Sequence, residues 1–123
     1  MNPNVEINFW SKLDSLISER EIVIDRPKGS THPRYPQILY SLDYGYIKDT
    51  HSSDGEDLDI WLGSHSDQRL DAVICAVDLN KRDLEVKLLI GCTSSEKSYI
   101  ESFYNKWSET GGILIERKTS IIL

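Results

Sequence analysis

Proline is the residue that most limits how this chain can fold. Pro27, Pro33 and Pro36 fall within residues 26–36, together with Gly29. Proline has no backbone N–H and its ring clashes with the preceding turn of a helix, so no long helix can pass through this stretch. The stretch therefore predicts a loop.

Apolar spacing predicts helices near the ends of the chain and strands between them. Apolar residues recur at helical intervals over residues 5–19. Residues 93–96 fit a capping box, which predicts a second helix that ends at the glycine pair 111–112. Strands or extended segments are expected at residues 21–25, 38–47, 57–62, 72–79, 84–90 and 113–116. This order predicts an α+β fold with a small sheet or barrel.

Length and charge narrow the classes of function. At 123 residues the chain is expected to form one domain, residues 1–123. Its 20 acidic and 14 basic residues give a net charge of −6, which argues against nucleic acid or an anionic membrane surface as a partner. An anionic substrate stays compatible with this charge, because a bound metal inverts the local field.

The sequence also gives an expectation for the cellular compartment. The N-terminus has no basic stretch followed by an apolar run, and there is no span of ~20 apolar residues for a membrane helix. Cys75 and Cys92 form no C-x-x-C pair or Cys/His cluster, so no zinc site is expected. We therefore expect a cytoplasmic protein with reduced thiols.

The first candidate site is an acidic run that carries four carboxylates within six residues, on Asp54, Glu56, Asp57 and Asp59. Such a cluster is equally consistent with a solvated loop and with a divalent cation site, because hard cations such as Mg²⁺ bind oxygen ligands. Gly55 permits the turn that folds the carboxylates inward. Strict alternation over residues 57–62 predicts a half-buried strand with Asp57 and Asp59 on one side.

A second pair of carboxylates is expected from a hairpin that joins two strands through residues 80–83. Its register places Asp78 opposite Glu85 and Ala76 opposite Lys87. Like charges directly opposite are destabilising, and a metal between them would reverse that interaction. The alternative is a solvated hairpin end in which Lys87 neutralises Glu85.

Basic residues follow Asp25 on the proline-rich loop. Lys28, His32 and Arg34 are either ordinary exposed charges or cations positioned to bind phosphate oxygens. The sequence has no Walker-type phosphate loop, no G-x-S-x-G and no cysteine–histidine nucleophile signature. Metal-assisted chemistry on a polyanion is therefore the leading hypothesis.

Three segments together resemble the family I soluble inorganic pyrophosphatases. The most specific is Asp43-Tyr44-Gly45-Tyr46-Ile47-Lys48-Asp49-Thr50 followed by Asp54-Gly55-Glu56-x-x-Asp59, which is similar to the family signature at the same spacing. Upstream lie Ile24-Asp25-x-Pro27-x-Gly29-Ser30 and Arg34-Tyr35, and downstream Asp78 and Glu85-Val86-Lys87-Leu88. The resemblance covers roughly residues 22–90.

This resemblance implies a fold, an activity and a set of roles. It implies a small OB-like five-stranded β-barrel with flanking N- and C-terminal helices, usually in a homo-oligomer, that hydrolyses pyrophosphate to two phosphates with Mg²⁺. The implied metal ligands are Asp54, Asp59, Asp78 and Glu85, with assistance from Asp25. Glu56 would orient the attacking water, Arg34 and Lys87 would hold phosphate oxygens, and Tyr44 would contact the site.

The chain also departs from the family pattern where substrate is gripped. Only residues 36–42 fill the place of a hairpin that carries a phosphate-binding arginine, for which Arg82 is a candidate substitute. A Tyr-Lys pair expected on the C-terminal helix aligns with Trp107-Ser108, which supplies no cation. Two alternatives therefore stay open beside pyrophosphatase activity. One is a metal- or phosphate-binding relative without hydrolysis, and the other is a hydrolase of another phosphoanhydride or phosphoester.

The amount of apolar surface on this short chain adds a separate reason to expect a homo-oligomer. Trp10, Trp61 and Trp107 are candidates for a shared interface or for the core.

Overall fold

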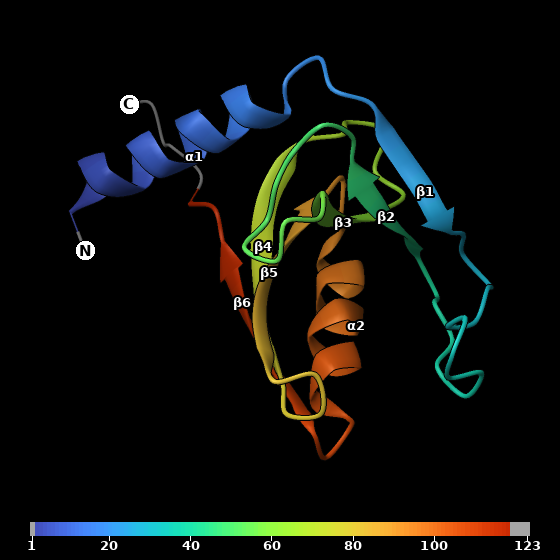
Figure 1. The fold of residues 1–123 in the computed structure, drawn as a ribbon. Coiled ribbons are helices and arrows are strands. Elements are labelled where there is room, and N and C mark those ends of the chain that lie inside the picture. Colours follow the sequence, from blue (N-terminus) through green and yellow to red (C-terminus); the bar gives the residue numbers. More distant parts are fainter. Residues whose placement is uncertain (1, 119–123) are drawn as a thin grey trace.

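The computed structural model describes residues 2–118 and contains two helices and one mixed sheet of six strands (Figure 1). In chain order the elements are α1 (Pro3–Ile17), β1 (Ile22–Arg26), β2 (Asp43–Ile47), β3 (Leu58–Leu62), β4 (Leu70–Asp78), β5 (Asp83–Ile90), α2 (Ser94–Asn105) and β6 (Thr110–Glu116). Within this part of the chain, neither helix is long and apolar enough to cross a membrane.

The predicted α+β class is confirmed, but the expected five-stranded barrel is not found. The sheet has six strands in the order β1-β2-β3-β5-β4-β6, and in residues 2–118 the outer strands β1 and β6 do not pair with each other. The second helix is also not the last element, because β6 follows α2 and pairs with β4.

Strand pairing brings the middle of the chain together. β3 pairs with β5 in parallel, and the other neighbouring strands are antiparallel. Tyr44 of β2 lies opposite Trp61 of β3, and Tyr46 lies opposite Asp59. Residues of the tyrosine–glycine segment and of the acidic run therefore lie side by side at the centre of the sheet.

The two helices cover opposite faces of the sheet. Ile100, Phe103 and Tyr104 of α2 pack on one face around the fully buried Trp61. Trp10 of α1 packs on the other face with Ile60, which is also fully buried. The prediction that β3 is only half-buried is therefore wrong, since Ile60 and Trp61 are both 0% exposed. Trp10 and Trp61 belong to the core rather than to an interface.

The α2 start is predicted correctly, but its end is not. Thr93 and Glu96 form the expected capping box. The helix stops at Asn105 rather than at the glycine pair, because the Asn105 side chain bonds to the backbone of Gly112. Both glycines lie inside β6. Trp107 lies beyond the helix in the turn that leads to β6.

The β4–β5 hairpin differs from its predicted register by two residues. Asp78 pairs with Asp83, Ala76 with Glu85 and Ile74 with Lys87, so the predicted pairing of Asp78 with Glu85 is wrong. The reason is a four-residue loop that starts at Leu79. The Asp78 carboxylate accepts the N–H groups of Asn80 and Lys81, and this Asx-type turn favours the earlier loop. A shift of two residues keeps every side chain on its predicted face.

Gly45 provides a test of the β1–β2 pairing. A Cβ at this position would lie 1.8 Å from the Val23 carbonyl oxygen, so Gly45→Ala forces the two strands apart. We expect a loss of about 1–3 kcal/mol or more in the free energy of unfolding, measured by urea denaturation.

Gly111→Ala is the matched control for this test. The nearest atom to its added Cβ is 3.7 Å away, which is ordinary contact. An equal loss of stability in both variants would contradict the close approach inferred at Gly45.

Candidate active site

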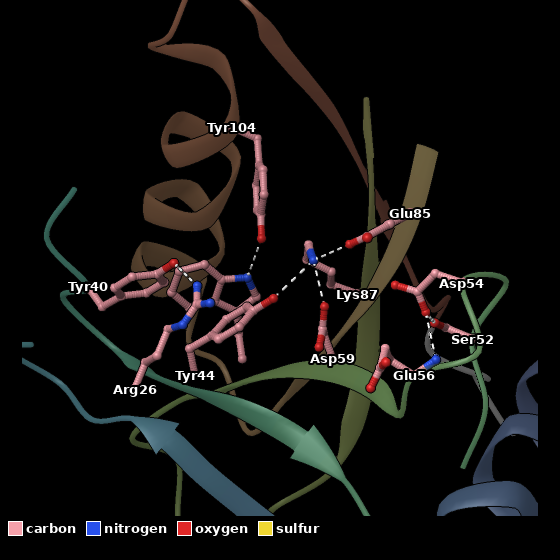
Figure 2. Close-up of polar contacts among 11 residues, drawn as sticks. Arg26, Tyr40, Tyr44, Ser52, Asp54, Glu56, Asp59, Glu85, Lys87 and Tyr104 are labelled. Atoms are coloured by element: carbon pink, nitrogen blue, oxygen red, sulfur yellow. Dashed lines mark hydrogen bonds and ion pairs between the residues drawn. The ribbon is translucent and has the colours of Figure 1, made fainter. Parts of the chain in front are cut away.

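The candidate active site centres on the ammonium group of Lys87 on β5 (Figure 2). Its Nζ donates hydrogen bonds to Tyr44 Oη at 3.0 Å, to Asp59 Oδ2 at 2.8 Å and to Glu85 Oε2 at 2.7 Å. The Lys87 side chain is only 10% exposed. One buried cation therefore connects side chains of β2, β3 and β5.

Electrostatics favour the charged form of Lys87 and of Glu85. Burial alone would lower the pKa of Lys87, but the oxygens of Tyr104, Tyr44 and Asp59 outweigh it and raise the pKa above its usual range. Burial likewise opposes ionisation of Glu85, yet its bond to Lys87 lowers the Glu85 pKa. Burial raises the pKa of Tyr44 well above its usual value, so its phenol stays protonated and retains a hydrogen to donate.

Beside Lys87 lies a cleft of about 500 Å³ whose lining is mostly acidic. Its acidic residues come from β1, the loop before β3, β3 itself and β5, and they are Asp25, Asp54, Glu56, Asp57, Asp59 and Glu85. Asp54 and Glu56 are exposed, but they line the same cleft as Asp59 and Glu85, the two carboxylates that contact Lys87 (Figure 2).

The loop carboxylates of the acidic run differ in their hydrogen bonds. Asp54 accepts the Ser52 hydroxyl and the Glu56 backbone N–H, and these bonds lower its pKa. Asp57 accepts the Thr50 backbone N–H at 3.0 Å and thereby holds the loop closed. Among the described residues, the Glu56 carboxylate accepts no such loop bond, so it stays available to orient a water.

The donor chemistry of the cleft suits a hard divalent cation. Its donors are carboxylate oxygens, and Asp59 and Glu85 already share one cationic partner, the Lys87 ammonium. No three carboxylate, imidazole or thiol groups converge as a ready-made metal cage within residues 2–118. Mg²⁺ does not require such a cage, because it keeps several waters and takes only one or two carboxylates directly.

Five residues singled out in the sequence do not line this cleft, namely Lys28, His32, Arg34, Asp78 and Arg82. Asp78 lines an adjoining pocket, where its carboxylate is bound to the hairpin turn, a position that does not favour metal binding. Arg34 is exposed and, in the described structure, lines neither the cleft nor that pocket. Arg82, the candidate substitute for a phosphate-binding arginine, lines neither of them either.

Arg26 is a site residue that the sequence reading missed. It lines both the cleft and the adjoining pocket, and its guanidinium lies 5.3 Å from the ring centroids of Tyr40 and Tyr44. It also donates to the Tyr40 hydroxyl. A register shift between Ile24 and Arg26 sets it opposite Tyr44. The sequence feature that points to Arg26 is a positive charge at the end of an apolar strand.

Tyr104 is the second missed residue. The family resemblance implies that the helix tyrosine is replaced by Trp107, whereas the structure brings Tyr104 to the pocket beside Lys87. Its hydroxyl accepts the Trp61 indole N–H at 3.0 Å. The next residue is Asn105, whose side chain is bound to Glu101 and Gly112, so this position supplies no cation to the site.

Comparisons with known proteins identify the family of this chain. A family model for inorganic pyrophosphatase matches residues 16–120, and the chain belongs to the inorganic pyrophosphatase family. Among solved structures, the crystal structure of an inorganic phosphatase from Anaplasma phagocytophilum is similar, with a TM-score of 0.53. The match has 15% sequence identity over 77% of this chain and 81% of that one, so it shows a shared fold alone. No curated protein sequence matches the chain.

The Glu85–Lys87 pair predicts a specific acid sensitivity. Because the folded-state pKa of Glu85 is lowered, its contribution to stability is present above the pKa of an unfolded glutamate, about 4.3, and is lost as pH falls through the folded value. We expect the free energy of unfolding of Glu85→Gln to fall less between about pH 5 and pH 2 than that of the natural chain.

The measurement is denaturant unfolding across this pH range, with Glu101→Gln as the control because Glu101 is an exposed residue of α2. An unchanged pH slope in Glu85→Gln would show that the ion pair does not stabilise the fold.

Proposed function

We propose that this chain hydrolyses inorganic pyrophosphate to two phosphates in the acidic cleft, with Mg²⁺ as cofactor. Membership of the inorganic pyrophosphatase family supports the reaction class. The observation that carries the proposal is the Lys87 cluster, in which one buried cation holds Asp59 and Glu85 at the edge of a cleft that also contains Asp54 and Glu56.

Magnesium would be held by carboxylates of this cleft, namely Asp54, Asp59 and Glu85, with Asp25 at its edge. When bound, the metal supplies an activated water and neutralises charge that develops on the phosphates. Glu56 is the proposed general base that takes a proton from the attacking water, because its carboxylate lines the same cleft.

Lys87, Arg26 and Tyr44 are the groups proposed to hold phosphate oxygens. An ammonium has three N–H donors, and in Lys87 all three have partners. Lys87 can therefore bind a phosphate oxygen only when one of these partners moves away, as Asp59 or Glu85 would do on turning to another cation. This requirement couples substrate binding to metal binding through a single side chain.

A binder without hydrolytic activity is the second candidate, and a specific observation favours it. Arg34 lies outside the cleft and Asn105 stands where a helix cation is expected, so fewer cations surround the substrate than the family pattern implies.

We also propose that the chain forms a homo-oligomer through the part of the sheet face opposite α2 that α1 leaves exposed. Five apolar side chains of β4, β5 and β6 are each at least 44% exposed there, namely Val77, Leu84, Val86, Ile113 and Ile115. Such a patch favours association with another apolar surface. A monomer in sedimentation at micromolar concentration would contradict this proposal.

The activity is tested by phosphate release from pyrophosphate with and without Mg²⁺ in the natural chain and in Asp59→Asn. This substitution keeps the shape of the side chain and removes the charge that contacts Lys87. We expect magnesium-dependent release in the natural chain and a loss of about 100-fold or more in the variant.

Asp67→Asn is the matched control, because Asp67 is an exposed loop residue away from the cleft lining. It should retain full release. No release from the natural chain, together with a melting temperature that Mg²⁺ raises, would favour the binder over the enzyme.

A further inference from the structure

An aromatic pocket of about 130 Å³ adjoins the acidic cleft. The pocket and the cleft share lining residues, including Arg26, Tyr44 and Lys87. The pocket has five further aromatic residues and three aliphatic ones, namely Tyr35, Tyr40, Phe103, Tyr104, Trp107, Ile38, Ala76 and Val77. Its remaining lining is polar and includes the carboxylates of Asp78, Asp83 and Glu85 on the β4–β5 hairpin. A molecule bound across the shared residues would therefore meet the acidic cleft at one end and most of the rings at the other.

The lining of this pocket suits a ring better than a phosphate. Tyr40, Phe103 and Tyr104 are each at most 8% exposed, so they present ring carbon rather than free charge. Phosphate oxygens need donors, and three cations line both the pocket and the cleft, namely Arg26, Lys81 and Lys87. Lys87 has three partners, Arg26 lies against two tyrosine rings, and the charge of Lys81 acts on the carboxylates of Asp83 and Glu85.

The size of the pocket also fits one ring. An engineered apolar cavity of about 150 Å³ holds a benzene molecule, so a volume of this order accommodates a single six-membered ring. Aromatic walls add offset or edge-to-face contacts with such a ring.

Hydrogen bonds hold the segment that carries Ile38 against α2, and the Trp107 indole N–H beside it has no acceptor among the described residues. The Tyr99 hydroxyl accepts the Ser41 N–H and donates to the Leu39 carbonyl, which ties the segment that carries Ile38 to α2. Trp107 lines the same pocket, and its indole N–H is buried without an acceptor in residues 2–118. Buried donors are normally bonded, so this one calls for an acceptor.

We infer that the preferred substrate is a diphosphate monoester whose organic group is a planar ring. This inference rests on the proposed function, because the diphosphate end lies in the acidic cleft while the ring occupies the aromatic pocket. Water adds to the terminal phosphorus, and the bond from that phosphorus to the bridging oxygen breaks. The products are the organic monophosphate and inorganic phosphate, and the water gives one proton to inorganic phosphate and one to solvent.

The charge of such a substrate matches the site. A diphosphate monoester has one ionisable oxygen fewer than pyrophosphate, because the ester replaces it. Arg34 lies outside the site, and Asn105 stands where the family pattern has a cation. The loss of these cations weakens the binding of a diphosphate monoester less than it weakens the binding of the more highly charged pyrophosphate. Burial of the ring then contributes the affinity that the missing cations do not.

The test compares kcat/KM for phenyl diphosphate, methyl diphosphate and pyrophosphate with Mg²⁺ and the natural chain. The two esters have the same charge and differ in the ring alone. We expect phenyl diphosphate to exceed methyl diphosphate by about 10- to 100-fold, the range that corresponds to burial of one ring. Trp107→Ala should reduce this ratio about tenfold, whereas Phe9→Ala, at an exposed aromatic residue of α1, should preserve it.

Equal values for the two esters, with pyrophosphate hydrolysed, would overturn the inference and leave the proposed function standing. If no diphosphate is hydrolysed, the proposed function fails. Calorimetry that compares the affinities for phenyl phosphate and methyl phosphate then tests whether the pocket binds a ring. Tighter binding of phenyl phosphate supports a ring site, and equal binding rules it out. Neither comparison depends on whether the Trp107→Ala variant folds.

Discussion

The buried ammonium of Lys87 is the interaction on which the rest of the site depends. It joins three strands that are far apart in sequence, through Tyr44, Asp59 and Glu85. Desolvating a cation is costly, and this cost is offset only when good partners surround it. Removal of Lys87 would leave the two carboxylates without their shared cation, and removal of one acceptor would leave one ammonium N–H without its partner, so the four groups are structurally interdependent. The same interdependence allows any new cation in the cleft to change the position or partners of Lys87.

The sheet makes this arrangement possible because its two faces have separate cores. α1 packs around Ile60 on one face, and α2 packs around Trp61 on the other. The α2 core is also the floor of the aromatic pocket, since Phe103 and Tyr104 belong to both. Stability and the proposed substrate recognition are therefore connected, because aromatic side chains that hold α2 on the sheet also line the pocket beside the proposed phosphate site.

Local patterns predicted the segments that carry the site, whereas pairing between strands decided its details. The spacing within residues 54–59 and the tyrosine–glycine segment identified the acidic cleft, because both lie within short stretches of chain. The hairpin register was wrong by two residues, since the turn bonds made by Asp78 were not recognised. Arg26 was missed because a register shift in β1, which no local pattern shows, sets it opposite Tyr44. Tyr104 reaches the pocket through tertiary packing of α2.

The central claim is that Lys87 is a buried, permanently charged link between substrate and metal ligands. It is tested most directly by nitrogen NMR of the lysine side chains in ¹⁵N-lysine-labelled protein, with Lys87→Met to assign the signal. We expect the Lys87 ammonium to stay protonated at about pH 10.4, where an ordinary lysine is half titrated, and its signal to shift when Mg²⁺ and phosphate are added together. A Lys87 signal that titrates with the exposed lysines and does not shift when Mg²⁺ and phosphate are added would contradict the claim of a buried, charged link.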